Sequence, residues 1–275
     1  MKQWHPIFAL LLRPRVEPYY EMRTTMPVGD APREADFVLL RRRRQTTPPF
    51  RGLWRHLTLW NILEYKGPSV SPRRGDVEAL VELGLGIERR LRAERSQPPP
   101  EEMSFWYLAN RLGRRFLGDA EEKLGGLEPL GPGLWRWQVL GRLVFLVSGI
   151  DLPVEEDSLP LHVIGHEPPA TELEVARLVM QQPQLEQLYG GWLATLHPEV
   201  WEEVEVMART ARRRFTIDLR PAIEHLGVKT VIEQVGLERV IEQVGEKEIV
   251  RQIGIDRILA SLSAAERREL KRRLQ

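Results

Sequence analysis

Three residues in the first quarter of the chain have the chemical types needed for metal-assisted hydrolysis. Glu64 and Lys66 stand two positions apart in an apolar run, and Asp36 lies in an earlier run of strand-forming residues. Because alternate side chains of a strand share a face, Glu64 and Lys66 are expected to project together. A neighbouring strand would bring the Asp36 carboxylate beside Glu64. Two converging carboxylates favour Mg²⁺, which polarises a phosphodiester while a lysine offsets charge in the transition state.

The spacing of Glu64 and Lys66 is not specific by itself. The same tripeptide pattern recurs at Glu121 and Lys123, in a stretch with helical character. The context distinguishes the first instance: an upstream strand candidate carries Asp36, a Gly-Pro turn follows Lys66, and helical periodicity begins soon afterwards. The combination, rather than the tripeptide, indicates a site.

The elements that must position these residues form a mixed α/β domain, which we predict over residues 1–168. Helices are expected over residues 4–12, ended by Pro14, and over residues 77–95 and 112–124. Strands are expected over residues 19–28, 35–40, 57–66 and 105–108, and in a hairpin formed by residues 135–140 and 143–148.

This arrangement resembles the PD-(D/E)xK nuclease superfamily, whose restriction-endonuclease-like core runs helix, three strands, helix, strand. In that core, Asp opens the second strand and Glu-x-Lys lies on the third, which correspond here to Asp36 and to Glu64, Tyr65 and Lys66. Ala35 replaces the proline that usually precedes the Asp. The resemblance covers residues 4–110 and is greatest to bacterial recombination-promoting nucleases and transposase-like proteins.

The resemblance implies a set of roles. Asp36, Glu64 and the backbone carbonyl of Tyr65 would bind Mg²⁺ or Mn²⁺, and Lys66 would be the catalytic cation. Many members of the superfamily add a carboxylate from the first helix or strand. Glu17 and Glu21 are the candidates here, and the sequence does not choose between them.

Charge is distributed unevenly along the chain. The formal net charge of the whole chain is +1, yet residues 1–75 contain 14 Lys or Arg and six Asp or Glu, a net charge of +8. This asymmetry indicates an anionic partner for the N-terminal part, with nucleic acid, most simply DNA, as the expected one. The candidate nucleic-acid-binding residues are Arg41, Arg42, Arg43, Arg44, Arg73 and Arg74. The alternative for each group is a solvated surface.

The last third of the chain has helical patterning. We expect a helical connector over residues 169–222 and a repetitive array over residues 223–275, in which glycines at 227, 236, 245 and 254 each open a nine-residue unit. A continuous helix would turn successive apolar stripes to opposite sides, so each glycine is expected to break the helix. The all-α extension would then serve for homo-oligomerisation or fold back as a stabilising tail.

Composition excludes several classes of protein. The chain has no cysteine, which excludes disulfides and thiol chemistry, and its early apolar run over residues 7–12 is too short to span a membrane. We therefore expect a soluble cytoplasmic protein. His162 and His166 have a possible metal-ligand spacing, but the glycine and prolines around them predict a loop.

Two functions are consistent with these features. The first is a metal-dependent deoxyribonuclease in mobile-element, defence or repair processes. The second is a catalytically silent nuclease-like module that binds nucleic acid or a protein partner and oligomerises through its C-terminal helices.

Overall fold

A computed structural model describes residues 4–24, 27–28, 33–34, 37–43, 46–94, 99–210, 217–235 and 240. The chain divides into two compact units, Met1–Leu178 and Val179–Gln275. Within the described ranges, no helix is both long and apolar enough to cross a membrane.

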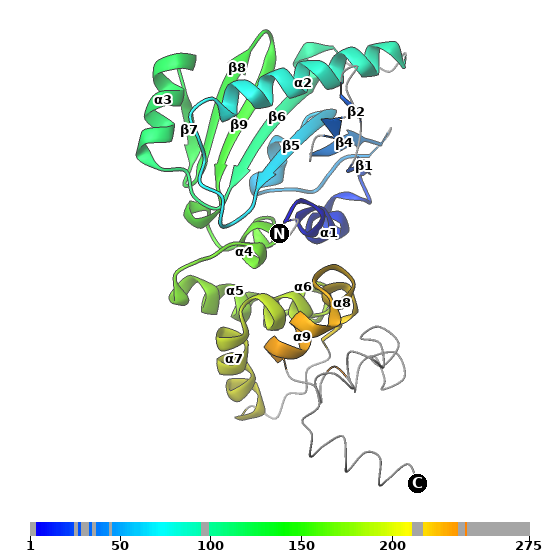
Figure 1. Ribbon diagram of the computed structural model, residues 1–275, viewed down its shortest axis with the longest axis vertical. Helices are drawn as coiled ribbons and strands as arrows, with labels where there is room; N and C mark the ends of the chain where they lie inside the picture. Colours follow the sequence, from blue (N-terminus) through cyan, green and yellow to red (C-terminus); the bar gives the residue numbers. More distant parts are fainter. Residues whose placement is uncertain are drawn as a thin grey trace, which may run out of the picture. The chain divides into compact units, whose positions relative to one another are not determined.

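The first unit is built around a seven-stranded mixed sheet with the strand order β1-β4-β5-β6-β9-β8-β7 (Figure 1). Its strands are β1 (Tyr20–Arg23), β4 (Val38–Arg42), β5 (Trp60–Lys66), β6 (Met103–Ala109), β7 (Glu128–Gly131), β8 (Leu134–Val139) and β9 (Arg142–Ser148). The two-residue strands β2 (Pro27–Val28) and β3 (Arg33–Glu34) form a separate pair. Its helices are α1 (Trp4–Val16), α2 (Asp76–Ala93), α3 (Arg114–Leu124) and α4 (Leu159–Ile164), with short 3-10 turns at Leu53–His56, Pro100–Glu102 and Gly149–Asp151.

The strand directions follow from the connections between them. The pairs β1–β4 and β4–β5 are antiparallel, whereas β5–β6 and β6–β9 are parallel. A parallel pair needs a crossover, and α2 supplies it between β5 and β6. The carboxyl ends of β5, β6 and β9 therefore lie together, with Lys66 opposite Ala109 and Ala109 opposite Ser148.

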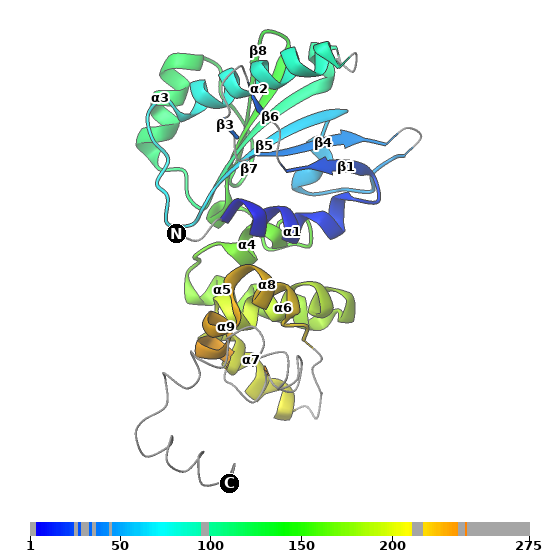
Figure 2. The same cartoon turned by 45° about the vertical axis from the view of Figure 1, so that its right-hand side comes forward.

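Different helices cover the two faces of the sheet. Helix α2 covers one face of the sheet (Figure 1). Its Leu80 and Ile87 belong to a buried core that includes Ile62 and Phe105. On the other face, α1 lies below β5 (Figure 2). Phe8 of α1 stacks on Tyr65. Because β5 is covered on both sides, only its carboxyl end is left partly open.

The expected α/β class, with a mixed sheet flanked by helices and further helices towards the C-terminus, is confirmed. The hairpin of β8 and β9 is confirmed too, and its two-residue turn places Leu140 and Gly141 at positive φ. Strand β7, which pairs with β8, was not expected.

Several expected boundaries are wrong. Helix α1 continues through Pro14 to Val16, because the buried side chains of Leu11, Leu12 and Val16 offset the hydrogen bond that Pro14 cannot donate. The single strand expected over residues 19–28 is two separate strands, β1 and β2, with different partners. The expected second strand begins at Val38 instead of residue 35.

The described part of the second unit is helical. It contains α6 (Pro183–Leu196), α7 (Pro198–Thr210), α8 (Arg220–Leu226) and α9 (Val228–Val235), while α5 (Pro169–Gln181) crosses the division between the units. Gly227 has a φ of 83° and separates α8 from α9, so the expected helix break at this glycine is confirmed. The later repeat glycines, at 236, 245 and 254, lie outside the described residues.

Candidate active site at the carboxyl end of β5

Strand β5 carries the Glu-x-Lys residues at its last three positions. Its aromatic and branched residues favour an extended conformation, and it pairs with β4 on one side and β6 on the other. Gly67 follows immediately and packs against the Trp4 side chain of α1. A side chain at position 67 would clash with that ring, so the residue that follows the Glu-x-Lys positions must be small.

Glu64 and Lys66 project to the α2 face, as the alternation of strand side chains predicts. The Lys66 ammonium donates a short hydrogen bond to Glu64 Oε1, and the side chains are 25 % and 17 % exposed, respectively. Lys66 Nζ also lies 5.8 Å from the centroid of the Tyr107 ring. The pair is therefore partly shielded from water but open to a ligand.

Tyr107 and Asp76 complete the surroundings of this pair. Tyr107 stands opposite Glu64 in the β5–β6 register, and its hydroxyl donates a hydrogen bond of 2.6 Å to Asp76 Oδ2. The same carboxylate oxygen accepts the Arg73 backbone N–H at 2.9 Å. Burial raises the pKa of Tyr107, and the hydrogen bond to Asp76 and the negative charges of Asp76 and Glu64 raise it further. Tyr107 therefore stays protonated as a hydrogen-bond donor.

Gly75 sets the position of Asp76. Its φ of 92° lies in the left-handed region, where a side chain would be strained, and α2 begins at the next residue. The turn places the Asp76 carboxylate at the helix N-terminus, where a negative charge is stabilised.

Tyr65 points to the opposite face. Its ring is 6 % exposed and stacks on Phe8 at a centroid distance of 4.8 Å. Its hydroxyl has no hydrogen-bond partner among the residues that the structure describes. Burial raises the pKa of Tyr65, and the negative charge of Glu167 adds to this effect. Only the backbone of Tyr65 faces the edge at which Glu64 and Lys66 lie.

The register separates Glu21 from Glu64. Glu21 pairs with Arg41, and Arg41 pairs with Trp60 at the amino end of β5. Trp60 and Glu64 are four residues apart, which corresponds to about 13 Å along a strand. A metal ligand must lie within a few ångströms of the ion, so Glu21 and Glu64 do not form one site.

Glu17 also lies at the far end of the sheet. Helix α1 begins with Trp4, which contacts Gly67, and its 13 residues extend about 20 Å. Glu17 follows the other end of this helix, 3.6 Å from Arg13, and its carbonyl accepts a hydrogen bond from Arg43. Neither candidate for the additional carboxylate is therefore brought to Glu64.

The arginines near residue 42 are bound to the fold. Arg42 donates to the Leu57 carbonyl at 3.0 Å and to the Tyr20 hydroxyl at 3.3 Å, and Arg43 Nε donates to the Glu17 carbonyl at 3.1 Å. The Arg41 guanidinium lies over the Trp60 ring at 5.0 Å. Arg44, the fourth residue of this predicted group, lies outside the described residues.

Arg73 and Arg74, by contrast, lie in the loop between β5 and α2, close to the candidate site. Both are exposed, and Arg74 Nε donates to Asp119 Oδ1 of α3 at 2.8 Å. Although burial alone would raise the pKa of Asp119, hydrogen bonds from Lys123 and Arg74 hold it below its ordinary value. Arg74 is thus partly neutralised by an acidic neighbour.

The oxygen donors in the described ranges suit a hard cation but do not complete a site. Glu64 and the Tyr65 carbonyl have the required chemistry, yet no group of three His, Cys, Asp or Glu that could hold a metal ion occurs among the described residues. Asp36, the predicted second carboxylate, lies outside them.

Sequence reasoning missed Asp76 and Tyr107 as neighbours of Glu64. It also missed Arg111 and Arg115, which follow β6. Because β5 and β6 are parallel, the residues that follow the two strands lie at the same edge of the sheet, and this rule could have indicated both arginines. The loop expected around His162 is wrong: His162 is buried in α4 and lies 3.1 Å from Glu167 Oε1.

Comparisons with known proteins identify no relative of the chain. No protein-family model matches the chain, and neither a curated protein nor a solved structure matches it.

Proposed function

We propose that the chain is a metal-dependent nuclease that hydrolyses phosphodiester bonds, with DNA as the expected substrate. The observation that carries the proposal is the placement of Glu64 and Lys66 side by side, partly exposed, at the end of a strand that leads into a helical crossover. The order α1, β1, β4, β5, α2, β6 also agrees with the core that the resemblance to PD-(D/E)xK nucleases implies.

In this proposal, Glu64, the Tyr65 carbonyl and Asp36 would hold Mg²⁺ or Mn²⁺. When bound, the ion would supply Lewis-acid polarisation of the scissile phosphate. Lys66 donates a hydrogen bond to a phosphate oxygen and offsets the negative charge that develops in the transition state. The Tyr107–Asp76 hydrogen bond fixes the position of the Tyr107 ring, whose centroid lies 5.8 Å from the Lys66 ammonium.

The test is cleavage of plasmid DNA and of labelled oligonucleotides by the purified full chain with Mg²⁺ or Mn²⁺. We expect Lys66→Ala and Asp36→Ala each to lower the rate at least about 100-fold, since each removes a group that acts on the transition state. Lys123→Ala is the matched control, because it removes the lysine of the second Glu-x-Lys pattern, which lies on α3.

Cleavage at the wild-type rate by both site variants would contradict the proposal. Salt-sensitive DNA binding without cleavage under any divalent metal would support the alternative, a catalytically silent nucleic-acid-binding module. The engagement of Glu64 with Lys66 is compatible with that alternative.

A further inference from the structure

A groove lies beside the candidate site, between the β5–α2 loop and the start of α3. It consists of two adjoining hollows of about 320 Å³ and about 290 Å³, which share Pro72, Arg115 and Phe116 in their linings. Arg74 and Asp119 line the first hollow, and Asn110 and Arg111 line the second. We call this feature the arginine groove. Its hollows are close to the lower limit of small-ligand sites, about 300 Å³.

The free charge of the arginine groove comes from Arg111 and Arg115. Both are exposed, and neither forms a hydrogen bond or ion pair with any residue that the structure describes. The other charged groups compensate one another: Asp119 accepts from Arg74 at 2.8 Å and lies 3.1 Å from Lys123, which also pairs with Glu78. Two unpaired guanidinium groups in a hollow are suited to phosphate, which they can bind in a bidentate manner.

Phe116 gives the groove an aromatic wall. One side of its ring stacks on Tyr107 at a centroid distance of 5.3 Å and an interplanar angle of 23°, and the ring lines both hollows. Tyr107 is in turn held by Asp76 and stands opposite Glu64. A rigid, half-buried aromatic ring beside free arginines matches the stacking platforms that bind unpaired bases.

The floor of the groove is fixed by Asn110. Its side-chain amide donates to the His166 carbonyl at 3.1 Å and its amide oxygen accepts the His166 N–H at 2.9 Å. This pair of hydrogen bonds anchors the segment that leads from β6 to Arg111. The groove is thus preorganised on the same side of the sheet edge as Lys66, whose β6 neighbour is Ala109.

We propose that the arginine groove binds one nucleotide of a single-stranded nucleic acid, with its base on Phe116 and its phosphate on Arg111 and Arg115. The inference rests on the proposed function in one respect: the bound nucleic acid would continue from the groove to Glu64 and Lys66, where cleavage is proposed. It makes unpaired or frayed nucleic acid the preferred substrate, because a base inside a duplex cannot stack on a side chain.

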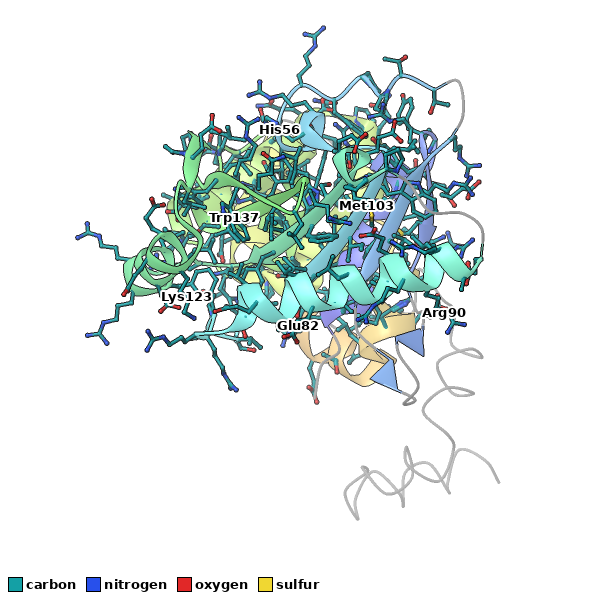
Figure 3. All side chains as sticks on the ribbon, turned by 90° about the horizontal axis from the view of Figure 1, so that it is seen from above. His56, Glu82, Arg90, Met103, Lys123 and Trp137 are labelled. Carbon is teal, nitrogen blue, oxygen red and sulfur yellow. The ribbon has the colours of Figure 1, made fainter. Side chains whose placement is uncertain are left out.

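The test is fluorescence anisotropy of the full chain in EDTA, so that binding is measured without cleavage. The probes are a labelled oligothymidylate of about 20 nucleotides, longer than the usual single-strand site sizes of about 4 to 16, a duplex of equal length, and dTMP as competitor. The variants are the double variant Arg111→Ala/Arg115→Ala and the single variant Phe116→Leu. The matched control is Arg89→Ala, an exposed arginine of α2 that has no partner among the described residues. Its neighbour Arg90 lies at the end of α2 away from Lys123 (Figure 3).

We expect the double variant to bind the oligothymidylate at least about tenfold more weakly, with a salt dependence lowered by about 0.7 for the one phosphate contact that is lost. Phe116→Leu should weaken single-strand binding at least about fivefold and leave duplex binding within about twofold, since only stacking is lost. Arg89→Ala should match the wild type. Because Phe116 also packs on Tyr107, a thermal unfolding scan must accompany that variant, while the exposed arginine pair tests the site without this complication.

Three outcomes would overturn the inference. Equal binding by the double variant and Arg89→Ala would remove the groove as a phosphate site. Equal loss of duplex and single-strand binding would leave a non-specific backbone contact. Competition by dTMP as strong as that of the oligomer would identify a free nucleotide as the occupant. None of these depends on cleavage, so they are distinguishable from a failure of the Lys66→Ala assay.

Discussion

The arginines at the two ends of β5 carry the same charge but have different surroundings. At the amino end, Arg42 and Arg43 donate to backbone carbonyls and to Tyr20. At the carboxyl end, Arg111 and Arg115 have no partner among the described residues and line a hollow. Arginine density in the sequence is higher at the amino end, yet the available charge is at the carboxyl end. The amino-end arginines hold the fold, and the carboxyl-end arginines are free to hold a ligand.

The largest effect that would test this comparison is on stability. Arg42→Ala removes hydrogen bonds to the Leu57 carbonyl and the Tyr20 hydroxyl, so we expect the free energy of unfolding to fall by about 2–3 kcal/mol. Arg115 is exposed and has no partner among the described residues, so Arg115→Ala should change the free energy of unfolding by no more than about 0.5 kcal/mol. Urea denaturation measures both values. Arg42→Lys, which keeps the charge but loses the planar fork, should be intermediate.

Equal stability of the Arg42→Ala and Arg115→Ala variants would break the comparison. It would mean that the hydrogen bonds of Arg42 to the Leu57 carbonyl and the Tyr20 hydroxyl only replace those that the guanidinium makes with water. Arg41, Arg42 and Arg43 would then again be candidates for nucleic-acid binding.

A smaller effect is expected for the tyrosines of β5 and β6. Tyr107→Phe removes the 2.6 Å hydrogen bond to Asp76, which should lower the free energy of unfolding by about 1–2 kcal/mol. Tyr65→Phe removes a buried hydroxyl without a described partner, so we expect no loss or a small gain. The two changes delete the same atom from neighbouring strands. A larger loss for Tyr65→Phe would show that its hydroxyl is satisfied by water.

The sequence was sufficient to predict the features that depend on local patterning. Strand-favouring composition located the strand that ends at Lys66, and the Gly-Pro turn that begins at position 67 marked its end. Pairing of Glu64 with Lys66 follows from the period of two. The α/β class follows from the order of the strand and helix patterns, without knowledge of their packing.

The features that were not predicted depend on register and on partners distant in the chain. Glu21 could not be separated from Glu64 until the β1–β4–β5 register was known. The contacts that occupy Arg42 come from Tyr20 and Leu57, and the pattern of charges does not show them. Arg111 is 45 residues from Lys66 in the sequence, and only the parallel pairing of β5 with β6 brings their segments together.

The smallest expected effect compares tyrosines at the two ends at alkaline pH. Burial raises the pKa of Tyr20, but the hydrogen bond and charge of Arg42 oppose the increase, whereas Asp76 and Glu64 add to it at Tyr107. A phenol with a raised pKa in the folded state contributes stability below its unfolded pKa of about 10 and loses it as pH rises further. When the folded-state pKa of a tyrosine lies well above about 10.5, that tyrosine should lower the free energy of unfolding by about 0.8 kcal/mol by about pH 10.5.

Urea denaturation at about pH 8 and about pH 10.5 measures this loss. Tyr107→Phe should reduce the alkaline loss by more than Tyr20→Phe does, because the anionic neighbours of Tyr107 keep it protonated while the Arg42 guanidinium favours the Tyr20 phenolate. An equal reduction in the two variants would mean that burial alone sets both pKa values. In that case, neither Arg42 beside Tyr20 nor Asp76 and Glu64 beside Tyr107 would affect the pH dependence of stability.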